Sequence, residues 1–205
     1  MAINLKKGQA ISLEKDNNDL SQITVGLGWK IRKRGLFSKL AGGNKEHDLD
    51  VIAFLMDKEG VVRNIGEKLV GSDVVFFNNL KHPSGDVFHT GDERVGGTGD
   101  TDNEKIIVRL HTLPARYHRI LFLAQIYHGV VNKQHFGEVE SAYMRAVDAK
   151  GVEIARYRLD SDSAYNNKCI MEFGEVYRHE GGWKFRALGN AHNTDNFVEI
   201  LRTHM

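Results

Sequence analysis

The chain has 205 residues, of which 41% are hydrophobic and 27% charged, which is an ordinary globular composition with enough apolar residues for a core. The net charge of +1 does not indicate a general nucleic-acid binder, and no apolar run reaches the roughly 18 residues that a membrane helix needs. The single cysteine, Cys169, excludes an intrachain disulfide framework and a Cys-rich zinc site. We therefore expect a soluble cytoplasmic protein that forms a single domain over residues 1–205, with Cys169 as a buried, inert thiol.

Alternating apolar residues and glycine-based turns predict strands throughout the first half of the chain. Residues 3–13 alternate around Gly8 and are predicted to form one edge strand. Residues 23–29 are predicted as a second strand, and residues 48–56 and 74–79 as two more. The last two carry acids or amides at their ends.

The segment Lys30–Lys45 breaks this pattern, because it mixes six cations with Leu36, Phe37 and Leu40. Two interpretations stay open. The segment is either a mobile, solvated insertion, counted here as residues 30–47, or a basic and apolar finger that contacts an anionic membrane surface or a partner.

The second half of the chain is also predicted to be β-structure. Residues 119–127 are apolar on both faces and are predicted as a central strand. Gly181-Gly182 predicts a tight hairpin between two strongly alternating runs. Residues 194–205 have apolar side chains at helical spacing behind a possible Thr194 cap. The predicted fold is therefore an all-β, two-sheet β-sandwich with a short C-terminal helix.

The stretch His89–Glu104 is acidic and rich in glycine, with Arg94 as its one cation. Such dense like charges repel one another, so a compact conformation needs a counter-cation or many hydrogen-bond donors. Oxygen ligands on a flexible backbone suit Ca²⁺, which binds six to eight carboxylate, carbonyl and water oxygens. A solvated hairpin connection is the plainer alternative. The position of Lys105 excludes a regular EF-hand, and no strand–glycine turn–helix order supports a phosphate site.

Acids and amides at other strand ends are expected to join this loop, because a sandwich gathers its loops at its ends. The predicted metal ligands are Asp48, Asp50, Asn78, Asn79, Asp92, Gly96, Asp100, Asp102 and Glu104. Neither a His-Glu-x-x-His pair nor a Gly-x-Ser-x-Gly elbow occurs, so we expect no enzymatic activity. His89 is predicted to be a surface residue of the hairpin.

Several ordered stretches resemble the TerD family of tellurium-resistance and stress proteins. They include Val25-Gly26-Leu27-Gly28-Trp29, Asp48-Leu49-Asp50, Phe77-Asn78-Asn79-Leu80, His89-Thr90-Gly91-Asp92 and Phe173-Gly174-Glu175-Val176-Tyr177-Arg178. The basic segment resembles the TerZ-like branch. The resemblance implies a β-sandwich that binds Ca²⁺, typically as a pair of ions. It also implies cytoplasmic work in stress responses beside other Ter-type proteins or a membrane-embedded partner.

Two functional hypotheses follow from these observations. The first is a calcium-binding, non-enzymatic stress-response protein whose ions tie loops of both sheets together. The second is an adaptor that grips a protein or a small phosphorylated ligand, with calcium having only a structural role.

Overall fold

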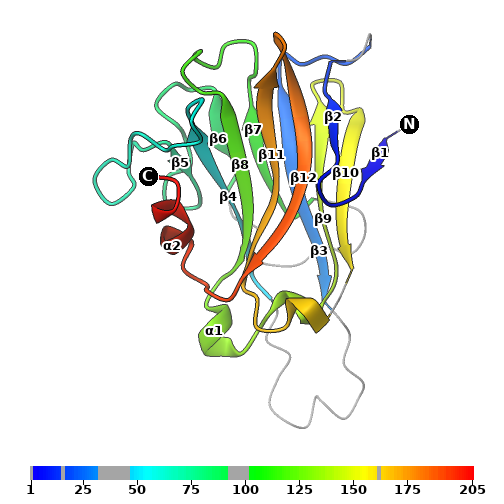
Figure 1. The fold of residues 1–205 in the computed structure, drawn as a ribbon, viewed down its shortest axis with the longest axis vertical. Coiled ribbons are helices and arrows are strands. Elements are labelled where there is room, and N and C mark those ends of the chain that lie inside the picture. The colour runs from blue at the N-terminus through cyan, green and yellow to red at the C-terminus, as the bar shows by residue number, and fades with distance from the viewer. Residues whose placement is uncertain (1, 15–16, 32–46, 92–101, 161–162) are drawn as a thin grey trace.

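The computed structural model describes residues 2–14, 17–31, 47–91, 102–160 and 163–205. Two six-stranded sheets pack face to face, as Figure 1 shows. The predicted two-sheet sandwich is therefore confirmed. The predicted basic insertion and most of the acidic loop lie outside the described residues.

The first sheet has the strand order β1-β10-β9-β3-β7-β6. Its strands are β1 (Ile3–Leu5), β10 (Glu153–Asp160), β9 (Val139–Asp148), β3 (Ile23–Ile31), β7 (Glu104–Val108) and β6 (Val87–His89). Neighbouring strands are antiparallel except β1 and β10, which are parallel.

The second sheet has the order β2-β12-β11-β8-β4-β5. Its strands are β2 (Ala10–Ser12), β12 (Gly182–His192), β11 (Ile170–His179), β8 (Arg119–Ile126), β4 (Leu49–Met56) and β5 (Val74–Val75). The helical elements are α1 (Gly129–Asn132), α2 (Phe197–Arg202) and the 3₁₀ turns η2 (Phe136–Glu138) and η3 (Ser163–Tyr165). Within the described chain, no helix is long and apolar enough to cross a membrane.

Apolar side chains fill both faces of the second sheet at β4 and β8. Leu49 and Val51 of β4 belong to the core between the sheets, whereas Ile52 and Phe54 belong to a second cluster that α2 covers. The Phe54 and Phe197 rings lie 6.3 Å apart, which places α2 over this outer face. This double burial explains why neither strand has a polar side, and β8 is central as its composition predicted.

The N-terminal segment corrects one prediction. Residues 3–13 form two short edge strands, one in each sheet, instead of one strand. A turn separates them, in which Gln9 N donates to Lys6 O over 2.9 Å and Gly8 has a φ of 82°. Glycine adopts this left-handed conformation without a Cβ penalty, so the chain can cross between the sheets here.

Two element ends also differ from prediction. β5 stops at Val75, and the backbones of Phe76 and Asn79 then pair across a tight turn. Helix α2 is capped by Asn196, whose side chain accepts from Val198 N over 3.1 Å, instead of by Thr194. The amide oxygen nearest the free helix N–H groups therefore decides the start.

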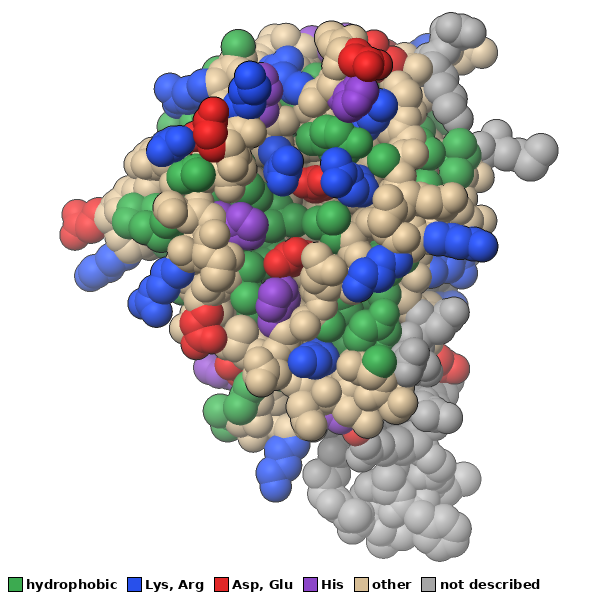
Figure 2. Space-filling view, viewed as in Figure 1, with side chains coloured by type: hydrophobic (Ala, Val, Ile, Leu, Met, Phe, Trp, Pro, Cys, Tyr) green, Lys and Arg blue, Asp and Glu red, His purple; other side chains and the backbone are tan. Residues whose placement is uncertain are grey.

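The outer face of the second sheet carries interspersed charges beyond the apolar part. Figure 2 shows cationic side chains spread among acidic ones on this face. Glu175, for example, lies 3.2 Å from the guanidinium of Arg119 and 3.2 Å from that of Arg186.

The apolar cluster beneath α2 gives a test of this architecture. We expect Phe54→Ala to lower the free energy of unfolding by about 3–5 kcal/mol, because it leaves a cavity under the helix. Val70→Ala is a control, since Val70 is 65% exposed, and should change stability by no more than about 0.5 kcal/mol. Urea unfolding measures both values, and equal small effects would contradict a packed outer cluster.

Candidate metal centre

The predicted ligands that the structure describes lie largely at one end of the sandwich. Leu49 at the start of β4 pairs with Ile126 at the end of β8, and Ile31 of β3 ends beside Val139 of β9. The connection from β6 to β7, which contains the acidic stretch, leaves at this end too. We call this end the rim. Asp92, Gly96 and Asp100 lie outside the described residues.

Glu104 joins the two sheets at the rim. It begins β7, and its side chain points between the sheets like those of Ile106 and Val108. Its carboxylate accepts a hydrogen bond of 2.5 Å from the backbone N–H of Val51 in β4. β5 pairs with β4 only at Ala53 and Phe54, so Glu104 supplies the acceptor that β5 is too short to supply. A hydrogen bond to a charged acceptor contributes about 1.5–3 kcal/mol.

His89 lies beside Glu104 and corrects a second prediction. The residue is 4% exposed and therefore buried, not on the surface. Its Nδ1 accepts from Gly91 N over 3.0 Å, so in the neutral ring the proton is on Nε2, which faces a Glu104 oxygen at 3.6 Å. At 3.6 Å this contact is longer than a hydrogen bond, so the ring borders the buried carboxylate and does not donate to it.

Asn103 ties the base of the acidic hairpin to β3. Its N–H donates to Leu27 O over 2.8 Å, and its side-chain oxygen accepts from Trp29 N over 3.2 Å. The Trp29 indole N–H in turn donates to His47 O over 3.1 Å. One aromatic residue therefore links the end of the acidic loop to the chain that enters β4.

Asp102 occupies a socket on the outer face of the first sheet. Arg145 of β9 binds both of its oxygens, through Nε at 2.7 Å and through the second guanidinium nitrogen at 3.0 Å. Gly26 makes room for this carboxylate, because a Cβ at that position would overlap it. Gly28 similarly makes room for the ring of Tyr143. The glycines of the Val25–Trp29 motif therefore serve side-chain packing on the sheet.

The Asp102–Arg145 pair continues into a charged row. Glu153 binds Arg145 at 2.9 Å and Arg156 at 2.6 Å, and the Arg156 guanidinium lies 4.3 Å from the centre of the Tyr143 ring. Hydrogen bonds from Arg156 and from Arg145 hold the pKa of Glu153 below its usual range, against the effect of burial. The bond to Asp102 likewise raises the pKa of Arg145.

Asp50 and Asp48 lie on the β4 side of the rim. Asp50 alternates with Leu49 and Val51, so its carboxylate lies on the outer face of the second sheet, in register with Gln125. It is only 4% exposed. Asp48 is half-buried, and its carbonyl accepts from Tyr127 N over 2.8 Å.

The two predicted amide ligands lie in the turn after β5. Asn78 is exposed there. Asn79 is buried, and its side chain donates to Val74 O over 2.6 Å and accepts from Gly71 N over 3.3 Å. The Asn79 side chain therefore closes the turn with both of its polar atoms.

The described acids thus meet at the rim but face three directions. Asp102 lies on the outer face of the first sheet, Glu104 lies between the sheets, and Asp50 lies on the outer face of the second. In the described ranges, no three His, Cys, Asp or Glu side chains are grouped closely enough to hold a metal ion. The carboxylate chemistry of Asp48, Asp50 and Glu104 nevertheless fits a hard cation such as Ca²⁺.

A row of Ser84, His82 and Asp73 lies away from the rim and has the residue types of a hydrolytic triad. His82 is 2.8 Å from the Ser84 hydroxyl and 3.1 Å from Asp73. The same atoms also bind backbone, because Ser84 N donates to the His82 ring and Asp86 N donates to the Ser84 hydroxyl, each over 3.1 Å. The His82 side chain has no exposed surface. This row of side chains, which sequence reasoning missed, therefore locks the turn 82–86.

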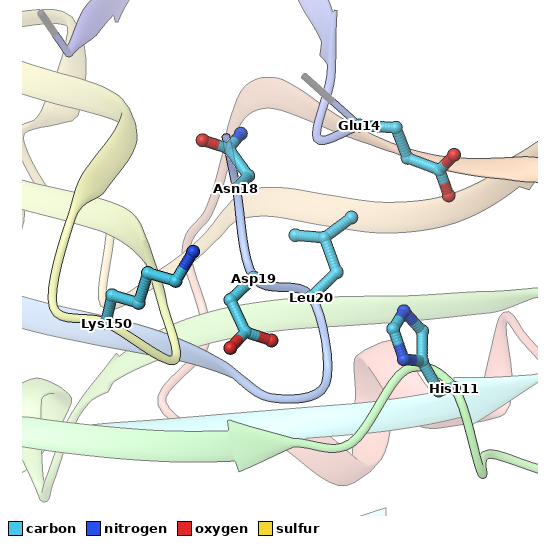
Figure 3. Close-up of a pocket in the computed structure, with 6 residues that line it drawn as sticks. All are labelled: Glu14, Asn18, Asp19, Leu20, His111 and Lys150. Carbon is cyan, nitrogen blue, oxygen red and sulfur yellow. The ribbon is translucent and has the colours of Figure 1, made fainter. Parts of the chain in front are cut away.

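A hollow of about 380 Å³ lies at the opposite end of the sandwich (Figure 3). It is lined by Glu14, Asn18, Asp19, Leu20, His111 and Lys150. Asp19 binds Ser21 through the hydroxyl and the backbone N–H, and these bonds lower its pKa. The Lys150 ammonium donates to Asn17 O over 3.4 Å. The charged side chains that line this hollow have opposite signs and bind local partners. We therefore interpret the hollow as a junction between loops.

The fold and the rim define a class of protein, a β-sandwich with an acidic hairpin fastened to one end. The TerD domain family matches residues 1–204, so the chain belongs to this family, as the resemblance predicted. The chain is 45% identical to "Tellurium resistance protein TerX" of Serratia marcescens over all of both chains. It is 36% identical to "General stress protein 16U" of Bacillus subtilis (strain 168), over 94% of this chain and 92% of that one.

A solved structure supports the fold independently. A homologue of a telluride resistance protein (TerD) from Streptomyces coelicolor A3(2) matches 90% of this chain and 98% of its own, with a TM-score of 0.63 and 18% identity. The chain is thus a member of a tellurium-resistance and stress protein family.

The Asp102 socket yields a prediction about Gly26. We expect Gly26→Ala to lower stability by about 1–3 kcal/mol, because the added methyl group must displace a carboxylate that Arg145 holds. In an Asp102→Ala background the same substitution should cost less, since the overlapping atoms are gone. A double-mutant cycle by urea unfolding measures the coupling, and strictly additive effects would refute the socket.

The Glu153 pKa gives a prediction about pH. Because the folded-state pKa lies below the usual 4.5, Glu153 stabilises the fold fully above pH 4.5, and this contribution disappears as the pH falls through the folded pKa. The stability difference between wild type and Glu153→Gln should therefore shrink with acidification, and less so in an Arg156→Met background. Urea titrations across pH measure it. A difference that grows on acidification would contradict the ion-pair row.

Proposed function

We propose that this protein is a calcium-binding, non-enzymatic stress-response protein whose ions bind between the acidic hairpin and the β4 side of the rim. Two ions are proposed, as the family resemblance implies. The proposed ligands are carboxylates of the 92–101 segment together with Asp48 and Asp50 for one ion and with Glu104 for the other, because Asp50 and Glu104 face different directions. Cytoplasmic work beside other Ter-type proteins or a membrane-embedded partner belongs to the same proposal and comes from that resemblance.

The bond between Glu104 and Val51 is the observation that carries this proposal. It fixes the start of β7 to the backbone of β4 one residue from Asp50. Asn103 and Trp29 fix the same end of the hairpin to the chain just before Asp48. Segments more than 50 residues apart are therefore held together before any ion binds, so an ion does not have to gather them.

Electrostatics supports a cation at the rim. Asp50 and Glu104 are both nearly excluded from solvent, and a cation beside a buried carboxylate offsets part of the cost of that burial in addition to the contacts that each already makes. The carboxylates of Asp48, Asp50 and Glu104 repel one another and the further acids of residues 92–102, because all are negatively charged. A divalent ion with flexible oxygen coordination reduces that repulsion, and Ca²⁺ tolerates such irregular ligand sets.

Asp102 has a different role in this proposal. Arg145 already binds both of its oxygens, so a metal ion could bind Asp102 only by displacing a guanidinium. We therefore assign Asp102 to anchoring the hairpin base on β9, and Asn79 to closing its own turn. This leaves the rim acids of β4 and Glu104 as the ligands outside the loop.

Calcium titration of matched variants tests the proposal. Wild-type protein should release or absorb heat with Ca²⁺ in calorimetry and melt at a higher temperature in Ca²⁺ than in EGTA, because the ion binds the folded state. Asp50→Asn keeps the side-chain shape but removes a ligand charge, so most of the shift in melting temperature should be lost.

The control is Glu180→Gln, which removes the same charge at the far end of β11, where the side chain is 84% exposed. It should keep both the heat and the shift. Wild-type protein that gives no calcium heat and the same melting temperature in Ca²⁺ and EGTA would defeat the proposal.

A further inference from the structure

A second feature of the rim is a projecting apolar tip. Helix α1 and its flanks, residues 127–133, are named here the α1 tip. Val131 is 79% exposed, the highest value for a large apolar side chain within the described ranges, and Val130 is 53% and Tyr127 40% exposed. Hydrophobic periodicity does not predict this tip, because a four-residue helix is too short to show a period.

The backbone of the α1 tip makes its own hydrogen bonds. Asn132 N donates to His128 O over 2.9 Å, and Gln134 N donates to Gly129 O over 2.8 Å. The N–H group of Val130 lies in the first turn, where the helix itself offers no acceptor, and it donates to the Asp195 carboxylate over 3.0 Å. These hydrogen bonds satisfy part of the backbone of the tip, which lowers the cost of moving it into a medium of low polarity.

Left-handed backbone flanks the helix of the α1 tip on both sides. His128 and Lys133, on either side of α1, have φ values of 52° and 55°, a left-handed conformation that is costly for residues with a Cβ. Such strain persists only where the surroundings impose it. Here Tyr127 N is bonded to Asp48 O, and a Cβ on Gly129 would lie 3.0 Å from the Cys169 sulfur, so the tip is seated firmly on the sandwich.

The order of side chains along the tip matches that of segments at a lipid interface. The valines form the end, the Tyr127 and His128 rings lie behind them with centres 4.0 Å apart, and exposed Lys133 follows. Apolar ends enter the acyl region, aromatic rings favour the headgroup level, and cations favour anionic lipid. The acid that contacts the backbone of the tip is Asp195, and its carboxylate accepts the hydrogen bond from Val130 N.

The shape of the tip favours a bilayer over a protein partner. Figure 1 shows α1 outside the two sheets, below the end of β8. A stable protein interface buries about 800 Å² on each partner with complementary shape, which two valines and a tyrosine do not provide. A bilayer needs no complementary shape.

We propose that the α1 tip docks on an anionic bilayer surface, with Val130 and Val131 inserted below the headgroups and Lys133 among them. This surface differs from the basic segment Lys30–Lys45 and goes beyond the proposed calcium binding, on which it does not rest.

Vesicle partitioning tests the proposal on the full-length chain. Wild type should sediment with phosphatidylcholine–phosphatidylserine vesicles more than with phosphatidylcholine vesicles. The double substitution V130D/V131D should reduce the partition coefficient about tenfold or more. Val70→Asp is the matched control, because it adds a charge at an equally exposed valine elsewhere, and should bind like wild type. Circular dichroism checks that each variant is folded.

A gain-of-function variant makes the test independent of any folding defect. Val131→Trp should bind more tightly, and its emission should shift to the blue with anionic vesicles, whereas the buried Trp29 and Trp183 provide a constant background. Equal partitioning of V130D/V131D and wild type would overturn the proposal. Any vesicle binding that is observed would then come from other segments of the chain. Tip-dependent self-association without lipid binding would overturn it in favour of a protein contact.

Running each arm in Ca²⁺ and in EGTA separates the two proposals. Tip-dependent vesicle binding without calorimetric calcium binding would defeat only the proposed calcium function. Calcium binding with partitioning that ignores the tip would defeat only the lipid inference.

Discussion

The arrangement of the rim depends on one hydrogen bond between the two sheets. β4 extends beyond its short neighbour β5, which leaves the N–H of Val51 at an uncovered edge. A buried N–H without an acceptor is costly, and Glu104 reaches across from β7 to supply one. The carboxylate is itself buried, so it needs donors in return, and the His89 ring lies beside it. The Val51 N–H group thus gains an acceptor and the Glu104 carboxylate gains a donor. This hydrogen bond fixes the base of the hairpin to β4.

The first sheet contributes a second anchor of a different kind. Asp102 lies in the space left by Gly26 and binds Arg145 through two parallel hydrogen bonds, the strongest geometry available to this pair. Gly28 leaves the space that the Tyr143 ring fills, and Arg156 covers that ring. The two glycines, which look from the sequence like a turn or a close backbone approach, instead act as sockets on a sheet face. An acid next in sequence to the acidic loop can therefore have a purely structural partner.

The fold was more predictable than the site, for physical reasons. The apolar residues on both faces of residues 119–127 identified β8 as central, because a strand that packs on both faces has no polar side. The split of residues 3–13 into two strands was missed, because apolar alternation continues through the turn at Gly8. The Asp102–Arg145 pair joins residues 43 positions apart, and no local pattern encodes it. His89 looked exposed in a polar context, yet the closing of the two sheets buries it.

The predicted ligands show the same limit. Alternation places Asp50 opposite Leu49 and Val51, but it does not say that Asp50 faces away from Glu104. Strand-end position suggested that Asn79 was available, whereas its amide closes the turn after β5. What the sequence did supply was the family, through many short ordered matches, and the family carried the fold with it.

The central claim is that the anchored hairpin base and the start of β4 form one calcium-responsive rim. Nuclear magnetic resonance of the ¹⁵N-labelled protein during a calcium titration tests it most directly. The account predicts that the amide signals of Leu49, Val51 and Asn103 move together with one saturation curve, while that of Gly181 at the far end stays in place. Unchanged signals at Val51 and Asn103 under saturating Ca²⁺, or changes as large at Gly181, would contradict the account.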